Sequence, residues 1–248
     1  MENNSVSIVV SWKSQYDPQT KSAIYRQVFS SPILLDSLNY EIALISLETF
    51  YSFPNIESGV NNVFAYKTAP ANPSQLIYIP TGNYEISALA TEISNQVTPV
   101  VYNNMILSRN TATLKSVFQI TGTYAIDFTV ANSLNSLLGF NNEIVGGAPG
   151  YYSGENIVNI LNVNSILVNC DLINNSYNNG ALSSVIYSFF PNVSPGFKIV
   201  RNVESPVYIQ VNKTQINSLT TWLTDQDGNL INFRGEVVTI RFHLRKIK

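Results

Sequence analysis

Apolar side chains recur at every second position over most of this chain, which is the period of a β-strand and not of a helix. The longest alternating run covers residues 40–53 (YEIALISLETFYSF), where both faces begin apolar, as in a strand packed on two sides. Shorter β-rich runs cover residues 5–12, 63–67, 76–80, 100–107, 114–121, 124–130, 157–163, 166–172, 184–190, 206–211 and 236–244. Clusters of Gly, Pro and Asn separate the runs, and many short strands divided by turns are typical of a β-sandwich or barrel.

Two segments carry helical periodicity instead. Residues 84–97 place apolar side chains on one stripe, and residues 133–140 (SLNSLLGF) place leucines inward before Gly139, a residue that commonly ends helices. We find no internal repeat at solenoid periods, and no linker-like stretch divides the chain. We therefore predict an all-β fold with one or two short inserted helices, forming a single domain with insertions over residues 1–248.

The composition excludes several classes of protein. Hydrophobic residues make up 45 % of the chain, which excludes disorder, and a net charge of −2 excludes a strongly basic nucleic-acid-binding domain. One cysteine, Cys170, excludes an internal disulfide framework, and one histidine, His243, excludes a His-rich metal centre. No stretch approaches the ~18 apolar residues of a transmembrane helix, and we recognise no signal-peptide pattern, so we expect neither membrane insertion nor secretion.

No motif in the chain predicts catalysis. The segment at residues 146–150 (GGAPG) lacks the Lys-Ser/Thr of a phosphate-binding loop and is interpreted as a flexible loop. The nucleophile-elbow pattern G-x-S-x-G is absent from the sequence, and no local motif supplies His243 with a base or nucleophile. We therefore predict a protein that is not an enzyme, with no catalytic, cofactor-binding or metal-binding residues.

One acidic segment resembles a calcium loop. Positions 1, 3, 5 and 12 of such a loop are matched by Asp225, Asp227, Asn229 and Glu236. However, the sixth position, which must be Gly for the sharp turn, is Leu230, and the flanking segments have strand character. Because Asp-Gly is a strong two-residue hairpin signal, we favour a structural hairpin at Asp227-Gly228 over a metal site.

Basic residues gather at the end of the chain. The strand expected at residues 236–245 (EVVTIRFHLR) has an apolar face and, on the other side, a basic face. Four cations there, which we predict as an assembly contact, are Arg241, Arg245, Lys246 and Lys248. One interpretation is contact with nucleic acid or an acidic partner, and the other is an ordinary solvated strand face and tail.

Three segments taken together resemble one protein family. They are residues 40–56 (YEIALISLETFYSFPNI), residues 76–97 (LIYIPTGNYEISALATEISNQV, followed later by LLGF at 137–140) and residues 223–245 (LTDQDGNLINFRGEVVTIRFHLR). In this order they resemble the minor capsid, or penton, protein of virophages and of the related Polinton/Maverick elements. The resemblance extends nearly end to end, although each motif alone occurs in many folds.

This resemblance implies a jelly-roll β-sandwich that assembles as a homopentamer at the fivefold vertices of an icosahedral capsid. The implied neighbours are trimers of a double-jelly-roll major capsid protein, and the implied location is the virion, after synthesis in the infected host cell. The basic C-terminus would contact packaged DNA or a neighbouring subunit. The alternative function is a receptor- or glycan-binding β-sandwich of a viral spike, for which Tyr151, Tyr152 and Tyr177 are the candidate aromatic residues.

Overall fold

A computed structural model describes residues 5–13, 23–37 and 39–247 of the chain. The chain divides into two compact units, one made of residues 1–53 and 163–248 and the other of residues 54–162. We call them the jelly-roll unit and the inserted unit. The sequence predicts one domain with insertions over residues 1–248. In the structure, the insertion is a unit with a hydrophobic core of its own.

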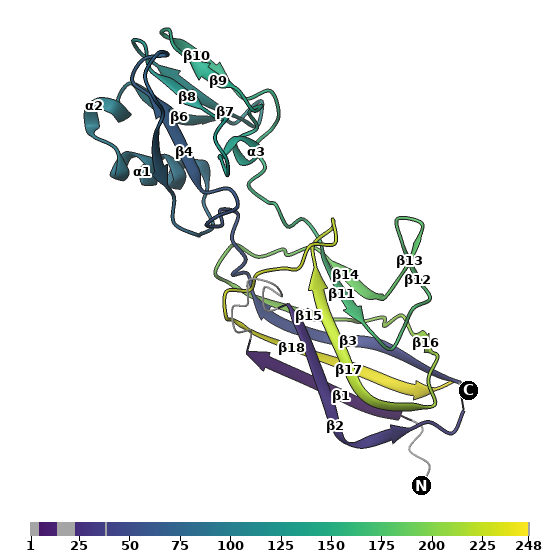
Figure 1. Ribbon diagram of the computed structural model, residues 1–248. Coiled ribbons are helices and arrows are strands. Elements are labelled where there is room, and N and C mark those ends of the chain that lie inside the picture. Colours follow the sequence, from purple (N-terminus) through teal and green to yellow (C-terminus); the bar gives the residue numbers. More distant parts are fainter. Residues whose placement is uncertain (1–4, 14–22, 38, 248) are drawn as a thin grey trace. The chain divides into compact units, whose positions relative to one another are not determined.

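The jelly-roll unit contains two antiparallel sheets (Figure 1). Sheet I has the order β1 (Ser5–Lys13), β18 (Val237–Lys246), β3 (Tyr40–Phe50), with β15 (Lys198–Asn202) and β16 (Ile209–Val211) both paired to the far side of β3. Sheet II has the order β14 (Val185–Phe189), β11 (Ile166–Cys170), β17 (Gln215–Thr224), β2 (Ile24–Leu34). The unit also carries a small hairpin of β12 (Ser176–Asn178) and β13 (Ala181–Ser183).

The order of these strands identifies the fold. When β15 and β16 are taken as one interrupted strand beside β3, the eight strands of the two sheets fall in the order 1-8-3-6 in sheet I and 2-7-4-5 in sheet II. This is the strand order of a jelly roll, in which two four-stranded sheets pack face to face. The prediction of an all-β jelly-roll sandwich is therefore confirmed, and residues 54–162 enter the fold between its third and fourth strands.

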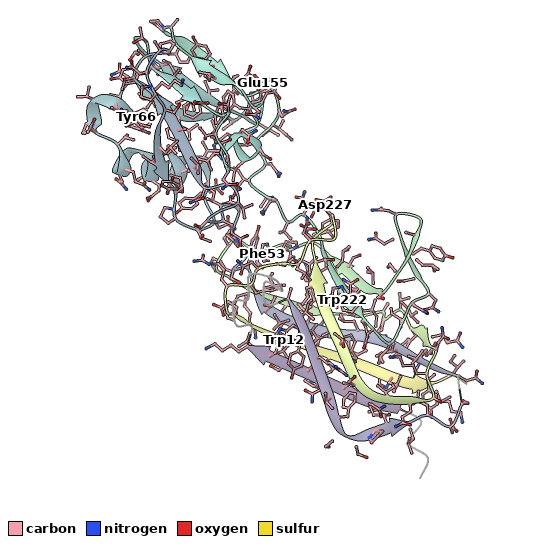
Figure 2. The ribbon with its side chains drawn as sticks, viewed as in Figure 1. Trp12, Phe53, Tyr66, Glu155, Trp222 and Asp227 are labelled. Carbon is pink, nitrogen blue, oxygen red and sulfur yellow. The ribbon has the colours of Figure 1, made fainter. Side chains whose placement is uncertain are left out.

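Alternating side chains of the two sheets form the core of the jelly-roll unit. In β18 the inward positions are all buried, and they are Val238, Ile240, Phe242 and Leu244. Trp12 of β1, which is labelled in Figure 2, stacks on Tyr25 of β2 with ring centroids 4.9 Å apart and joins the two sheets at one edge. At the other edge, the Arg201 guanidinium of β15 lies 5.1 Å from the ring centroid of Phe189 in β14.

The inserted unit is also β-rich and contains the helices. Its sheets have the order β5 (Gln75–Tyr78), β4 (Val63–Lys67), β8 (Ala125–Asp127), β9 (Ile144–Gly146) and the order β10 (Gly150–Ser153), β7 (Lys115–Ile120), β6 (Met105–Asn110). The helices are α1 (Ile86–Gln96), α2 (Pro99–Tyr102) and α3 (Asn135–Leu138). Its core combines aliphatic side chains with four phenylalanines, and the rings of Phe128 and Phe140 stack with centroids 4.8 Å apart.

The structure corrects two of the expected strands. Residues 100–107 were predicted to be extended, and residues 105–107 do belong to β6. The first part of this run is wrong, because Pro99 begins the short helix α2, as expected for a residue whose φ is preset for a first helical turn. Residues 157–163 have no strand assignment, although Val158 N–H donates to the carbonyl of Leu114. The two predicted helices are confirmed in shortened form as α1 and α3, and Gly139 ends α3 in the left-handed conformation with φ 77°.

Candidate assembly surface

The basic face predicted near the C-terminus is the outward face of β18, the strand that lies between β1 and β3 in sheet I (Figure 1). The burial pattern of β18 alternates between buried and accessible positions, so Arg241 and Arg245 point away from the core. The predicted division of this strand into an apolar and a basic face is confirmed. Lys248 lies outside the described residues.

Arg245 is held by two contacts within its own subunit. Its Nε lies 2.7 Å from Oε1 of Glu41, the residue opposite it in the β18–β3 pairing. Its guanidinium carbon lies 3.4 Å from the centroid of the Tyr208 ring, a cation–π contact. Tyr208 in turn lies with its hydroxyl 2.8 Å from Nδ1 of His243. The Arg245 charge is therefore compensated within the subunit.

Lys246 also forms an ion pair within its own subunit, whereas Arg241 forms none with the described residues. The Lys246 Nζ donates to Oδ2 of Asp36 at 2.5 Å, and this hydrogen bond holds the pKa of Asp36 below its ordinary value. Arg241 lies between Val9 of β1 and Ser46 of β3, and none of the ion pairs recorded for the described residues involves it. The structure describes three of the predicted contact residues. Among these three, Arg241 is the one without an ion-pair partner in the described part of the chain.

The described residues around His243 do not form a catalytic constellation. The contact of His243 is with Tyr208, and the described residues contain no group of three or more His, Cys, Asp and Glu side chains that could hold a metal ion. Cys170 is buried in β11, and burial raises the pKa of its thiol to about 12, so the thiol stays protonated at neutral pH. Within the described part of the chain, no helix is long and apolar enough to cross a membrane.

A shallow hollow on sheet I is too small to suggest a ligand site. Its volume is about 230 Å³, and it is lined by Glu48, Thr49, Phe50, Lys198, Val237 and Thr239. Lys198 and Glu48 form an ion pair with Nζ and Oε2 2.5 Å apart. Pockets that bind small molecules usually measure ~300–1,000 Å³ and have mostly apolar walls. We therefore assign it no ligand.

The segment that resembles a calcium loop is a hairpin turn (Figure 2). The carboxylate of Asp225 accepts hydrogen bonds from the N–H groups of Asp227 at 2.9 Å and Asn229 at 2.8 Å, so it stabilises the turn. Asp225 N–H donates to the carbonyl of Asn229, which makes a three-residue loop in place of the predicted two-residue loop. Gly228 occupies the left-handed position with φ 85°, as usual at the end of such a loop.

A buried carboxylate stands out in the inserted unit. Asp127 of β8 accepts hydrogen bonds from the hydroxyl of Ser74 at 2.5 Å and from the hydroxyl and N–H of Thr129 at 2.6 Å and 3.0 Å. Burial raises the pKa of Asp127, but these hydrogen bonds outweigh it and leave the pKa below its ordinary value. The donors come from the chain itself, so the group is structural.

We expect acid to destabilise the inserted unit through Asp127. Because the folded-state pKa is lowered, the carboxylate stabilises the fold above its unfolded pKa of ~3.9, and this contribution disappears as the pH falls through the folded-state pKa. The measurement is hydrogen exchange of the inserted unit between about pH 6 and about pH 3 in wild type and Asp127→Asn. The stability difference between the two proteins should shrink as the pH falls, and a constant difference would contradict the assignment.

The tyrosines that favour a glycan-binding function do not form a cluster within either unit. Tyr151 and Tyr152 are neighbours in β10 and point to opposite sides, so Tyr151 is exposed while Tyr152 packs on the core of the inserted unit. The Tyr152 hydroxyl donates to the carbonyl of Ala148. Tyr177 belongs to the other unit. Each unit thus exposes only one of the three predicted tyrosines, Tyr151 in the inserted unit and Tyr177 in the jelly-roll unit.

Comparisons with known proteins find similarity in structure but no match in sequence. No protein-family model matches the sequence, and no curated protein matches it. The structure is similar to that of the mavirus penton protein, with 11 % identity and a TM-score of 0.49 over 98 % of this chain and 100 % of that chain. It is also similar to a chain in the cryo-EM structure of the Sputnik virophage, with 15 % identity and a TM-score of 0.46 over 99 % of this chain and 98 % of that chain.

Proposed function

We propose that this protein is a structural minor capsid protein that forms homopentamers at the fivefold vertices of an icosahedral virophage-like capsid. The observation that carries the proposal is the 1-8-3-6 and 2-7-4-5 strand order of the jelly-roll unit, an architecture used by viral capsid proteins. The virion is then its location and the major capsid protein its neighbour.

The positions of the resembling segments support the same proposal. Residues 40–56 include β3 and residues 223–245 include most of β18, which pair with each other in the centre of sheet I. Residues 76–97 include α1 and most of β5 in the inserted unit. The resemblance to virophage penton proteins thus involves both units and the strands that define the sandwich.

Low charge is compatible with extensive subunit contact. Charged residues make up 12 % of the chain, about half the usual ~25 %. Burying an unpaired charge in an interface is costly, so a subunit with few charges loses less when its flanks are covered by neighbours. A cyclic assembly repeats one heterologous interface until the ring closes, and a pentamer uses it five times.

The glycan-binding alternative has weaker support. It requires several aromatic side chains presented together, and within each unit the structure exposes only one of the predicted tyrosines, Tyr151 or Tyr177. Binding of glycans to the purified chain, measured on an array with Tyr151→Ala and Tyr177→Ala as controls, would favour the alternative if either substitution abolished it.

The basic outward face of β18 is proposed as an assembly contact, and Arg241 is its most informative member. Replacing Arg241 with Ser is expected to change the free energy of unfolding by no more than ~0.5 kcal/mol, because the residue is exposed and forms no ion pair with the described residues. Incorporation of the chain into particles, measured by quantitative mass spectrometry, should nevertheless fall. The control is Arg109→Ser, an exposed cation in the inserted unit whose ion pair with Glu85 is loose, with Nη1 and Oε2 3.8 Å apart.

A triple replacement of Arg245, Lys246 and Lys248 with Ser separates the remaining interpretations. Loss of vertices while the isolated chain stays folded would support a contact with neighbouring subunits. Intact vertices with less encapsidated DNA would support contact with the packaged genome, and normal particles with normal DNA content would show that the segment is a solvated strand end. Loss of the Arg245–Glu41 pair itself should cost only ~0–1 kcal/mol, because exposed ion pairs contribute little.

The proposed function is tested by removing the chain from the particle. Particles produced without it are expected to retain the major capsid protein and to lack density at their fivefold vertices, and supplying the chain should restore that density. Complete particles formed without the chain would contradict the proposal.

A further inference from the structure

The longest stretch of the chain without a charged residue is residues 172–197, which lie between Asp171 and Lys198. This segment includes the β12–β13 hairpin, strand β14 at one end of sheet II, and the loop that leads to β15. Its large exposed apolar side chains, each 65–72 % exposed, are Tyr177, Leu182, Phe190 and Phe197. We call this surface the β14 edge.

The β14 edge has the composition of an interface core. Depletion of charge together with enrichment of aromatic side chains distinguishes the centre of protein interfaces from the rest of a surface. The three most exposed Tyr and Phe side chains among the described residues of the jelly-roll unit all belong to this edge. Large apolar side chains exposed together along one uncharged segment indicate an interaction site.

Hydrogen bonds within the exposed hairpin fix its shape before any partner binds. Asn179 and Gly180 have φ values of 49° and 80°, the positive pair of a type I′ turn, and Tyr177 lies opposite Leu182 in the ladder. The Ser176 hydroxyl donates to the Ser183 carbonyl at 2.7 Å. Figure 1 shows this hairpin extending from the sheets, so its apolar pair is presented on an ordered scaffold.

The loop after β14 is fixed in a similar way. Arg201 donates to the carbonyl of Phe190 and, at 3.0 Å, to Oδ1 of Asn192. Tyr51 N–H donates to the carbonyl of Phe197 at 2.9 Å, and its own carbonyl accepts from Gly196 N–H at 2.8 Å. Both Phe190 and Phe197 are thus exposed on backbone that is already ordered, which lowers the entropy lost on binding.

The other end of sheet II offers a surface of the same chemistry. Strand β2 is the end strand there, and residues 27–35 carry no charge. Val28 and Leu34 in this strand are 62 % and 75 % exposed. Among the described residues no strand pairs with the outer edge of β2, and an end strand with apolar side chains is a template for pairing with another chain.

The direction of the strands permits these two surfaces to meet between copies. Sheet II is antiparallel throughout and has four strands, so its end strands β14 and β2 run in opposite directions. A second copy rotated about an axis parallel to the strands would therefore bring its β2 antiparallel to β14 of the first. Repetition of that rotation is a heterologous contact of the kind that closes into a ring.

We propose that the β14 edge binds the β2 end of sheet II in a second copy of this chain. The inference rests on the proposed function, because it names the surfaces through which the proposed ring would form. Both the β14 edge and the β2 end are apolar and uncharged, so they can bind each other without a partner of opposite charge.

Thiol cross-linking tests the proposal. The native cysteine, Cys170, is buried and its thiol stays protonated, so it contributes no background reaction. The variant Leu182→Cys with Val28→Cys is treated with a short bismaleimide, both as purified chain at rising concentration and within particles. The matched control replaces Val28→Cys by Val9→Cys, which is exposed on the outward face of sheet I. Circular dichroism verifies that every variant is folded.

We expect covalent oligomers in the Leu182/Val28 variant and at least about tenfold fewer in the Leu182/Val9 control. Adding Phe190→Asp should reduce cross-linking by a similar factor, because it buries a charge in the contact. Equal cross-linking in both pairs, or none in either sample, would overturn the proposed contact while leaving the capsid function intact. Absence of the wild-type chain from particles would instead overturn the proposed function.

Discussion

Replacing Phe242 with Ala is expected to lower the free energy of unfolding of the jelly-roll unit by about 3–5 kcal/mol. The ring is completely buried in the core, in the strand that lies between β1 and β3. Its removal loses the transfer free energy of the side chain and leaves a cavity that neighbours such as Leu44, its partner in β3, fill only in part. Because domains are stable by only ~5–15 kcal/mol, this is a large share of the total.

The effect is measured by urea unfolding followed with the jelly-roll tryptophans, Trp12 and Trp222. The control is Val9→Ala in β1, whose side chain is exposed on the outward face of the same sheet, and we expect it to change stability by no more than ~0.5 kcal/mol. Equal effects of the two substitutions would show that Phe242 does not pack in the core as described.

Replacing Gly139 with Ala is expected to destabilise the inserted unit by about 2–5 kcal/mol, as the sum of two separate costs. The residue has φ 77°, a conformation that L side chains rarely adopt. In addition, a Cβ atom there would lie 2.4 Å from the carbonyl oxygen of Asn156 and 2.9 Å from that of Ile157. Neighbouring backbone would have to move, since neither atom belongs to a flexible side chain.

Gly59 separates these two costs. It has φ 78° in the same unit, but no atom lies within 4 Å of the Cβ position. Gly59→Ala should therefore cost only the ~1–2 kcal/mol of the left-handed backbone. The comparison is made by hydrogen exchange on both variants, and a Gly139→Ala effect no larger than that of Gly59→Ala would refute the close approach.

The sequence predicts those elements whose side chains alternate without interruption. Strands β1 and β18 show this pattern, the short apolar run of β11 is buried on both faces, and the amphipathic stripe predicts α1. Strand β2 was missed because Ser30, Ser31 and Pro32 resemble a turn, although Pro is tolerated in an end strand, where it gives up no ladder hydrogen bond. The β12–β13 hairpin was also missed, and Asn179-Gly180 is the signal that predicts it.

The division into two units could not be predicted for a different reason. No change in composition marks residues 53–54 or 162–163, and the inserted unit is β-rich like its host. Whether neighbouring strands belong to one core depends on pairing between residues far apart in the chain, such as β3 with β18. Such pairing has no local signal in the sequence.

The candidate assembly surface could likewise be predicted only in part, because some of its contacts depend on pairing between distant residues. The alternation of apolar and polar side chains correctly places Arg241 and Arg245 on one face of a strand. Compensation of Arg245 by Glu41 and of Lys246 by Asp36 depends on the register between β18 and β3 and on the path of the chain before β3. The sequence therefore identifies the cations, and the structure distinguishes the ones that are already paired within the subunit.

The most direct measurement is a cryo-EM reconstruction of particles that contain this chain, refined locally around the fivefold axes. We predict five copies around each axis, with density that fits the jelly-roll unit and its two four-stranded sheets. Vertices built from another protein, or a number of copies other than five around the axis, would contradict the proposal that this protein closes the fivefold vertices of the capsid.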